Sequence, residues 1–402
     1  MLVTTPVPAW SSLVPPAAPM REWLMERFFR AFVSAAPVRV AFPGGEVIGR
    51  GGPSSPIMRV IRPSHLFRRL AVVGPIGLGE AYMAGDWTST DPAGLLTPFA
   101  ARLKRPPSRM VALLRRRLGQ ARPDTDLGTP DGARSNARKH YDLSNDLFAL
   151  FLDESMTYSA ALFGPDDDLH SAQLRKIDAV LDDARVGKGT RLLEIGSGWG
   201  ELALRAARRG ASVITVTLSS EQQRFVRERL DVEGLSDSVR VVLQDYREIE
   251  GSYDAVVSVE MIEAVGSRYW PDYFAVLDRV LAPGGALALQ AITMPHERMS
   301  AMRGVHTWIG KHIFPGGQLP SMRVVEEGLR IQGLRIAERR SLGQHYARTL
   351  DEWRNRFLAH REQVASAGFD DGFQRMWDFY LAYSEAGFRS GFLNVWQLRV
   401  TR

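Results

Sequence analysis

Hydrophobic and polar positions follow two different patterns along this chain, and the change falls near residue 140. Before it, short apolar runs are broken by glycine and proline, as at Val38–Phe42, Met58–Ile61 and Leu70–Val73. Runs this short and this often interrupted predict a small mixed domain at the N-terminus.

After residue 140, apolar runs of strand length alternate with segments of helical periodicity. Helical patterns cover Glu201–Arg209 and Glu221–Leu230. The predicted strands are Arg191–Ile195, Val213–Leu218, Val239–Leu243, Ala255–Val259 and Ala286–Ile292. Strands that alternate with helices in this way form a parallel sheet covered on both faces. We therefore predict an α/β fold with a Rossmann-like, doubly wound sheet.

The charge distribution and the change in the pattern of apolar runs together suggest the domain boundaries. We expect an N-terminal domain over 1–105, a basic helix and linker over 106–138, and a second domain over 139–402. Residues 1–130 contain 17 Lys and Arg against 8 Asp and Glu, so this part carries the excess positive charge. Within 102–122, eight cations and no acid accompany an apolar stripe. This favours a polyanion or an anionic membrane surface as partner, and an ordinary solvated helix is the alternative.

The overall composition excludes several classes of protein. Hydrophobic residues make up 45% and charged residues 24% of the 402 residues, which is typical of globular proteins and argues against disorder. No apolar run approaches the roughly 20 residues of a membrane-spanning helix. The absence of cysteine excludes disulfides, thiolate nucleophiles and cysteine-ligated metals. We expect a cytoplasmic protein and assign no metal site.

The first candidate for chemistry is the glycine-rich segment that follows the strand at 191–195. It reads Glu194-Ile-Gly-Ser-Gly-Trp-Gly200 and leads into a helix at Glu201. The GxGxG spacing differs from the GxGxxG dinucleotide fingerprint, and the acidic residue expected about 20 positions later is missing, which argues against an NAD-dependent oxidoreductase. The segment resembles the first motif of class I S-adenosylmethionine methyltransferases. A glycine turn without a ligand is the alternative.

Two later strands end in polar residues that suit the same pocket. Gln244-Asp-Tyr246 follows one strand and offers an amide, a carboxylate and an aromatic face for an adenine. Glu260 and Glu263 follow the next strand, near where a transferable methyl group would lie. Negative charge at a helix N-terminus is the alternative explanation for these two acids.

Several longer phrases resemble one family, the cyclopropane-fatty-acyl-phospholipid synthases and mycolic acid cyclopropane synthases. The match covers 135–402, and a weaker one at Ile76–Trp87 resembles the N-terminal domain of the phospholipid-acting members. The phrases are His140–Phe148, Met156–Ser159, Val216–Gln223, Val257–Gly266, Trp308–Ser321, Phe388-Arg and Trp396-Gln.

The resemblance implies methyl transfer from S-adenosylmethionine to the double bond of an acyl chain, through a carbocation that aromatic rings and negative charge stabilise. Tyr346 matches a family tyrosine, whereas core packing is the alternative for Tyr158, Trp308, Tyr380 and Phe388. The predicted cofactor-binding residues are Tyr158, Ser159, Glu194, Gly196, Ser197, Gly198, Gly200, Thr217, Leu218, Gln222, Gln244, Asp245 and Tyr246.

The family also holds a bicarbonate ion as general base, and this resemblance assigns its binding to Ala160, Glu263, Gln290, Ile292 and Tyr346. The chain departs from the family pattern at three places: Ala160 and Ser384 stand where cysteines are usual, and Gln290 stands where histidine is usual. Glutamine can donate a hydrogen bond to an anion but cannot take up a proton.

These departures resemble an actinobacterial subgroup that methylates oleoyl phospholipids on the way to 10-methyl-branched (tuberculostearic) acid. The implied product is a 10-methylene chain, with cyclopropane formation as the alternative. The implied partners are an unsaturated phospholipid in an anionic membrane, a second copy of the chain, and a separate reductase for the methylene product. A nucleic-acid-binding module is disfavoured because the basic segment lacks interleaved aromatic residues.

Overall fold

The computed structural model describes residues 14–104 and 144–402, and these divide into two compact units. Unit 1 comprises residues 14–104, Gly304–Ile313 and Arg354–Phe392, and unit 2 comprises residues 144–303, Phe314–Trp353 and Leu393–Arg402. The boundaries at 105 and 138 that we expected, and most of the basic segment 102–122, lie outside the described residues. No helix in the described part is long and apolar enough to span a membrane.

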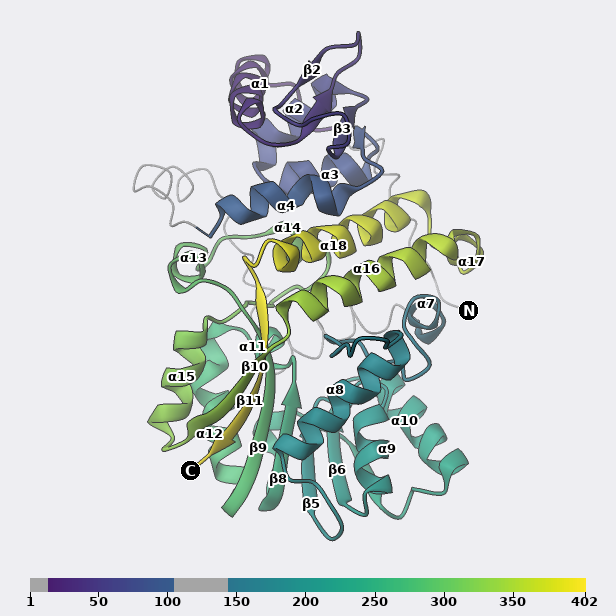
Figure 1. Cartoon of the computed structure of the whole chain (residues 1–402), viewed down its shortest axis with the longest axis vertical. Helices are drawn as coiled ribbons and strands as arrows, with labels where there is room; N and C mark the ends of the chain where they lie inside the picture. The colour runs from purple at the N-terminus through teal and green to yellow at the C-terminus, as the bar shows by residue number, and fades with distance from the viewer. Residues whose placement is uncertain (1–13, 105–143) are drawn as a thin grey trace. The chain divides into compact units, whose positions relative to one another are not determined.

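Unit 1 combines a small sheet of order β2-β1-β3-β4 with helices drawn from three parts of the sequence (Figure 1). The C-terminal helix α18 packs on α3 and α4, which is why Arg354–Phe392 belongs with the N-terminal residues. The elements of unit 1 are α1 (Pro19–Ser34), β1 (Arg39–Ala41), β2 (Val47–Ile48), β3 (Ile57–Val60), α2 (Pro63–Val73), α3 (Ile76–Met83), β4 (Trp87–Thr88), α4 (Pro92–Arg102), α14 (Trp308–His312), α17 (Arg361–Ser366) and α18 (Asp371–Arg389).

Unit 2 is built on a seven-stranded sheet of order β10-β11-β9-β8-β5-β6-β7. Strands β7, β6, β5, β8 and β9 are parallel, and β11 pairs antiparallel with both β9 and β10. The strands are β5 (Arg191–Ile195), β6 (Ser212–Thr217), β7 (Val239–Leu243), β8 (Tyr253–Val259), β9 (Leu281–Thr293), β10 (Arg335–Ser341) and β11 (Asn394–Thr401).

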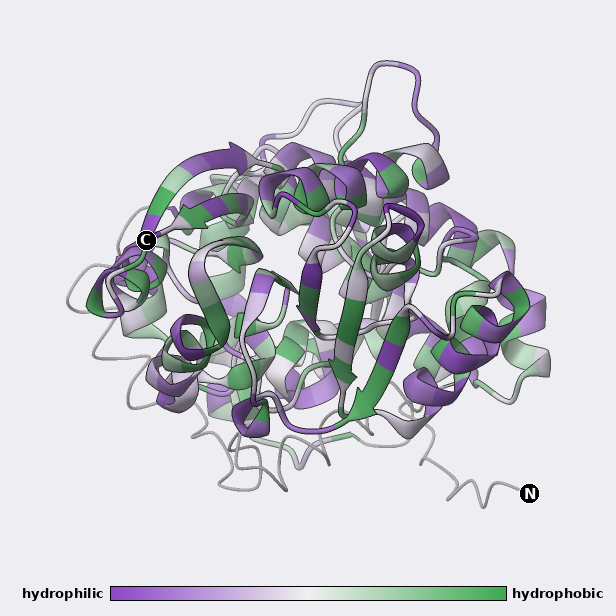
Figure 2. Ribbon diagram, turned by 90° about the horizontal axis from the view of Figure 1, so that it is seen from below, coloured by the Kyte–Doolittle hydropathy of each residue, from purple (hydrophilic) through white to green (hydrophobic). Residues whose placement is uncertain are grey.

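Helices cover both faces of this sheet, as predicted. Neighbouring strand residues point to opposite cores: Leu192 packs with α8, α9 and α10, and Leu193 packs with α12 and α15. The helices alternate between hydrophobic and hydrophilic residues, as expected for one buried side (Figure 2). The helices are α7 (Asn145–Ala149), α8 (Leu169–Asp183), α9 (Glu201–Arg208), α10 (Ser220–Glu233), η2 (Tyr246–Glu248), α11 (Ile262–Val265), η3 (Ser267–Tyr269), α12 (Trp270–Val280), α13 (His296–Ala301) and α15 (Met322–Ile331); α16 (Gly343–Ala359) runs across the division between the units.

The topology identifies where a ligand site belongs. The strand order reverses direction at β5, whose neighbours are β6 on one side and β8 on the other. In open α/β sheets the crevice beyond the carboxyl ends of the strands at such a point binds ligands. The glycine turn follows β5 and the Glu260–Glu263 segment follows β8, so both lie at this edge of the sheet.

Candidate functional site

The turn after β5 requires glycine at three positions, for two different reasons. Gly196, Gly198 and Gly200 all have positive φ angles, of 98°, 50° and 93°. A Cβ on Gly196 would lie 2.5 Å from Met261 Sδ, and one on Gly200 would lie 2.7 Å from Val226 Cγ1. A Cβ on Gly198 would meet nothing within 4 Å. Positive φ and close packing together disfavour side chains at the outer two positions, whereas Gly198 faces open space that a ligand can occupy.

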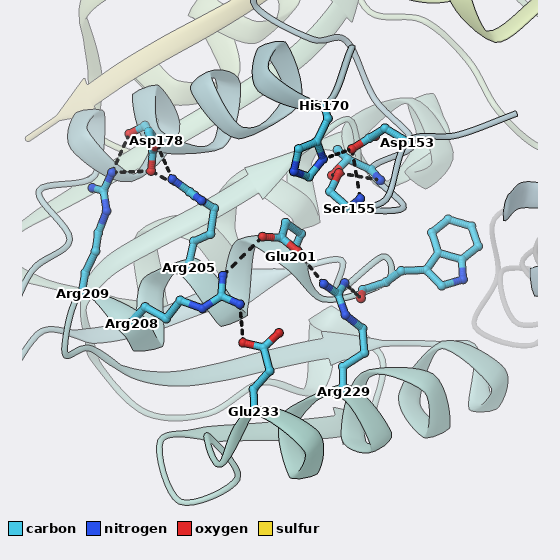
Figure 3. A network of polar contacts seen from close by, with 12 residues as sticks. Asp153, Ser155, His170, Asp178, Glu201, Arg205, Arg208, Arg209, Arg229 and Glu233 are labelled. Atoms are coloured by element: carbon cyan, nitrogen blue, oxygen red, sulfur yellow. Dashed lines mark hydrogen bonds and ion pairs between the residues drawn. The ribbon is translucent and has the colours of Figure 1, made fainter. Parts of the chain in front are cut away.

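Polar contacts hold this turn from the side of α10. Arg229 donates to the carbonyl oxygen of Trp199 at 2.9 Å and pairs with Glu201 at 2.6 Å (Figure 3). The amides of Gly196 and Ser197 both donate to the Val216 carbonyl oxygen at 3.0 Å. The turn is thus fixed on two sides by contacts that a ligand need not supply.

Glu194 lies beneath the turn and is buried. The Thr215 hydroxyl lies 2.6 Å from its Oε2 atom and 2.7 Å from the Ser197 hydroxyl. Burial raises the pKa of Glu194 to about 8, although the Thr215 hydrogen bond and the nearby Lys176 act in the opposite direction. Glu194 therefore forms part of a buried polar group that supports Ser197.

The predicted polar side chains after β6 and β7 are largely engaged with neighbouring protein groups. Thr217 donates to Gln222 Oε1 at 2.8 Å, next to the half-buried Leu218. Gln244 donates to the Glu248 carbonyl oxygen, and the Asp245 carboxylate accepts from the guanidinium of Arg247 at 2.6 Å.

Tyr246, the last residue of the predicted adenine-binding segment, packs into the core beside Tyr273, with ring centroids 5.8 Å apart. Burial raises its pKa. Of the three side chains in this segment, Gln244 is the one that is not buried.

Ser159 and Tyr158 approach the same region from the segment before α8. Lys176 of α8 is 1% exposed and donates to Ser159 Oγ at 2.6 Å. Burial lowers the pKa of Lys176 to about 8, and the acids Glu260, Asp153 and Glu194 act against this shift. Lys176 was not among the residues predicted from the sequence, although its place among the apolar positions of a helical pattern is a detectable signal.

Tyr158 belongs to an aromatic cluster within unit 2. Its ring centroid lies 5.2 Å from that of Phe148 and 5.1 Å from that of Trp353. Tyr346 also contacts Trp353, at 6.0 Å. Three other candidate aromatics, Trp308, Tyr380 and Phe388, are buried in unit 1, which favours the core-packing alternative for them.

The chemical centre of unit 2 is the carboxylate of Glu260. Three donors converge on it: the Ala160 amide at 2.9 Å, the Gln290 side-chain amide at 2.7 Å and the Tyr346 hydroxyl at 3.0 Å. Glu260 has a φ of 52°, a strained conformation for a residue with a side chain, and such strain often marks functional positions. The sequence pointed to Glu260 as one of two acids after a strand but did not indicate this role.

Glu263 lies beside Glu260 and has a different environment. Its Oε1 atom accepts a hydrogen bond from the Ile292 amide, and its Oε2 atom is buried with no hydrogen-bond partner among the described residues. Burial and then the neighbouring Glu260 charge raise the pKa of Glu263 to about 8. One of the two adjacent carboxyls is therefore protonated near neutral pH, while the other is surrounded by donors.

The predicted bicarbonate does not fit this arrangement. The three expected donors Ala160, Gln290 and Tyr346 already bind the Glu260 carboxylate, and the Ile292 amide binds Glu263. A planar carboxylate supplied by the chain thus occupies the position that the family resemblance assigned to a planar anion.

The raised pKa of Glu263 predicts a pH-dependent stability. In the folded protein this carboxyl keeps its proton up to about pH 8, whereas in the unfolded chain it loses it near the ordinary value of 4.5. Wild type therefore loses stability relative to Glu263→Gln as pH rises from about 5 to 8, by up to about 1.4 kcal/mol per pH unit. Urea unfolding of both proteins at several pH values measures this, and a constant stability difference would contradict the burial argument.

Comparisons with known proteins match most of the chain. Residues 129–398 match the family model described as mycolic acid cyclopropane synthetase. The chain is 48% identical to the tuberculostearic acid methyltransferase UfaA1 of Mycobacterium tuberculosis, over 96% of this chain and 93% of that one. It is 34% identical to the cyclopropane-fatty-acyl-phospholipid synthase of Escherichia coli K12, over 89% and 92% of the two chains.

Solved structures extend the likeness. The mycolic acid cyclopropane synthase CmaA1, complexed with SAH (S-adenosylhomocysteine) and CTAB, superposes with a TM-score of 0.62 at 31% identity, covering 70% of this chain and 99% of that one. Coclaurine N-methyltransferase superposes with a TM-score of 0.63 at 17% identity, covering 81% and 99%, which supports the fold alone. The fold is that of the class I methyltransferases.

Proposed function

Because the chain belongs to the mycolic acid cyclopropane synthetase family, we propose that it methylates the double bond of unsaturated acyl chains in membrane phospholipids and forms a 10-methylene product. The enzyme is an S-adenosylmethionine-dependent methyltransferase. The substrate proposal draws on the name of its 48% identical relative, a tuberculostearic acid methyltransferase. Cyclopropane formation, named for the 34% identical E. coli relative, is the alternative product.

The glycine turn is compatible with S-adenosylmethionine. The open space beside Gly198 lets the backbone approach a ligand. The contacts of Arg229 and Val216 fix the conformation of the turn before a ligand binds. When bound, S-adenosylmethionine supplies an electrophilic methyl group to the alkene, which leaves a positive charge on the acyl chain. From the predicted set, we propose that these residues bind it: Ser159, Gly196, Ser197, Gly198, Gly200 and the half-buried Leu218 and Gln244.

The observation that carries the mechanism is the convergence of three donors on Glu260. Hydrogen bonds from Ala160, Gln290 and Tyr346 favour the ionised carboxylate and hold it in one orientation. Burial raises the pKa of Glu260 above its ordinary value, and these hydrogen bonds and the positive charge of Lys176 act against this rise. We propose that Glu260 accepts the proton that the acyl chain loses, and that its negative charge stabilises the cation before this loss.

The product is tested directly by lipid analysis. A 10-methylene product has no hydrogen on the carbon that received the methyl group, so a hydride must move to the neighbouring carbon before the methyl group loses a proton. A cyclopropane forms instead if the methyl carbon bonds to that neighbour as it loses the proton. Purified enzyme, oleoyl phospholipid and S-adenosylmethionine should give methyl esters that ozone cleaves at the methylene group. Exclusively ozone-resistant product would identify a cyclopropane synthase.

Gln290→His is expected to increase the cyclopropane share of the product. An imidazole at this position can take up a proton, so the neutral donor that Glu260 receives from the amide can be replaced by a cation. We expect the base to take a different position and total turnover to fall. Gas chromatography–mass spectrometry of the methyl esters measures the ratio of cyclopropane to methylene product. An unchanged ratio in an active variant would show that residue 290 does not control the product.

Helix α1 supports a peripheral attachment to the membrane. Five large apolar side chains recur at helical spacing on its exposed side: Met20, Trp23, Leu24, Phe28 and Phe32, which are 42–78% exposed. The acids of the helix are already paired, Glu22 with Arg68 and Glu26 with Arg30. The exposed residues of the helix also include Arg21 and Arg27, so its exposed side is apolar and cationic, which suits the interface of an anionic membrane. We propose attachment to the inner face of the plasma membrane.

The double variant Trp23→Ser, Phe28→Ser is expected to bind anionic oleoyl phospholipid vesicles at least about tenfold more weakly, since two aromatic side chains no longer leave water. Vesicle co-sedimentation measures this. Val232→Ser, which changes an 88% exposed side chain on α10, is the matched control and should bind as wild type does. Equal weakening of both variants would exclude a specific role of α1.

Two partners inferred from the family resemblance complete the proposal. We propose that the enzyme is a homodimer, which light scattering after size-exclusion chromatography tests. We also propose that a separate reductase saturates the methylene group, because the residues argued to act here transfer no hydride to the lipid. Cells that express this chain alone should then accumulate the methylene lipid and no 10-methyl lipid.

A further inference from the structure

A line of polar side chains runs behind Glu260, across strands β9, β11 and β10. Gln290 and Gln397 stand directly opposite each other in the antiparallel pairing of β9 with β11, and each is 1% exposed. The Gln397 amide nitrogen lies 3.0 Å from Gln290 Oε1, and the Gln290 amide nitrogen lies 2.7 Å from Glu260 Oε1. Two buried amides therefore connect Glu260 to the edge of the sheet.

Groups that can only donate or only accept fix the direction of this line. Arg340 of β10 donates to Gln397 Oε1 at 2.7 Å, and a guanidinium has no acceptor. The nitrogen of Gln397 also lies 3.3 Å from the Lys176 carbonyl oxygen, which can only accept. The oxygen of Gln397 must then face Arg340, and its nitrogen must face Gln290.

The same logic determines the orientation of Gln290. Its oxygen receives the Gln397 donor, so its nitrogen points to Glu260 and to the Ala160 carbonyl oxygen at 3.3 Å. In the reverse orientation, the Gln290 oxygen would face two acceptors, and Gln397 would have no acceptor at this position. The hydrogen bond that Glu260 receives from Gln290 thus depends on a residue 107 positions later in the chain.

We propose that Gln397, anchored by Arg340, is a positioning residue for the reaction: it holds the Gln290 amide with its nitrogen toward Glu260 and so keeps Glu260 a proton acceptor. The inference rests on the proposed role of Glu260 as base. Gln397 does not contact Glu260 directly and acts through Gln290.

Other ionisable groups face Glu260 and must be considered in any pH experiment. Lys176 of α8 favours the ionised carboxylate, the Tyr346 hydroxyl of α16 donates to it, and the Glu263 carboxyl of α11 is its acidic neighbour. A substitution at residue 397 replaces none of these side chains, but Gln397 also lies 3.3 Å from the Lys176 carbonyl oxygen. Arg340→Met leaves Gln397 and its Lys176 contact in place, so this variant tests the path through Gln290 separately.

The decisive comparison is Gln397→Glu against Gln397→Met. The glutamate still pairs with Arg340 but presents an acceptor to Gln290, so the Gln290 amide turns and places its oxygen against Glu260. We expect the acid limb of the kcat/KM profile to move to higher pH by at least about one unit, the effect of losing a hydrogen bond to a charged group. Methionine removes the amide without placing an acceptor there, so its shift should be less than half as large.

Substitutions at Arg340 give a second test. They are less harmful to folding, since the Arg340 side chain is 44% exposed. Arg340→Met should shift the acid limb in the same direction by a smaller amount, and Arg340→Lys, which retains a donor-only group, should restore it. If neither Gln397→Glu nor Arg340→Met moves the limb, the positioning role is excluded; should Gln397→Glu not fold, Arg340→Met decides. Glu260→Gln with wild-type turnover would instead exclude Glu260 as base, so the two failures are distinguishable.

Discussion

Glu260→Gln is expected to lower kcat by about 10²–10⁴-fold, the usual contribution of a general base, while the affinity for S-adenosylhomocysteine stays within about threefold of wild type. Glutamine has the shape of glutamate, and its oxygen can still accept from the Ala160 amide and from Gln290. Its nitrogen can donate to the Tyr346 hydroxyl. The substitution thus removes the charge and the proton acceptor and retains the hydrogen-bonding frame.

Calorimetric titration and single-turnover kinetics separate binding from chemistry in this variant. Because the effect belongs to the transition state, kcat and kcat/KM should fall together. Glu263→Gln is the matched comparison: it also replaces a buried carboxyl with an amide, but at a group that is protonated near neutral pH. A Glu260→Gln variant as active as wild type would show that Glu260 is not the general base.

Gly198→Val is expected to abolish cofactor binding and leave the fold intact. The added side chain enters the open space beside the turn and meets no protein atom within 4 Å at its Cβ. We expect the dissociation constant of S-adenosylhomocysteine to rise at least about 100-fold, the equivalent of roughly 3 kcal/mol. Circular dichroism and calorimetry on the same sample measure both properties.

Backbone strain must be separated from steric exclusion in this experiment, because valine disfavours a positive φ. Gly234→Val is the matched control: Gly234 caps the C-terminus of α10 with a φ of 67°, and a Cβ there also meets nothing within 4 Å. It should lose similar stability and keep full cofactor affinity. Equal affinities in the two variants would mean that the turn does not contact the cofactor.

Much of the fold was predictable because local pattern and tertiary environment agree. The strands at Arg191–Ile195 and Val239–Leu243 match the predicted bounds, since Leu, Ile and Val dominate both runs and the residues that face the core are buried. Strand β10 (Arg335–Ser341) was missed. It is an edge strand that contains arginine and glutamate, which protect an exposed edge but remove the hydrophobic signal.

The site was only partly predictable, because its chemistry depends on partners far apart in the sequence. Glu260 meets donors from residues 160, 290 and 346, and Lys176 stands among three acids from different segments. A sequence pattern shows neither the burial nor the convergence. Conversely, Asp245 follows a strand as a binding residue would, but the nearby Arg247 already pairs with its carboxylate.

The contacts that fix the glycine turn from α10 and from β6 have a kinetic consequence. Arg229 and the Val216 carbonyl oxygen hold the loop in one conformation. The conformational entropy of the loop is therefore lost during folding and not when the cofactor binds. Association should then be a single step without a slow isomerisation, and the observed rate in stopped-flow mixing should rise linearly with cofactor concentration. Arg229→Met would loosen the loop and make that rate level off at high concentration.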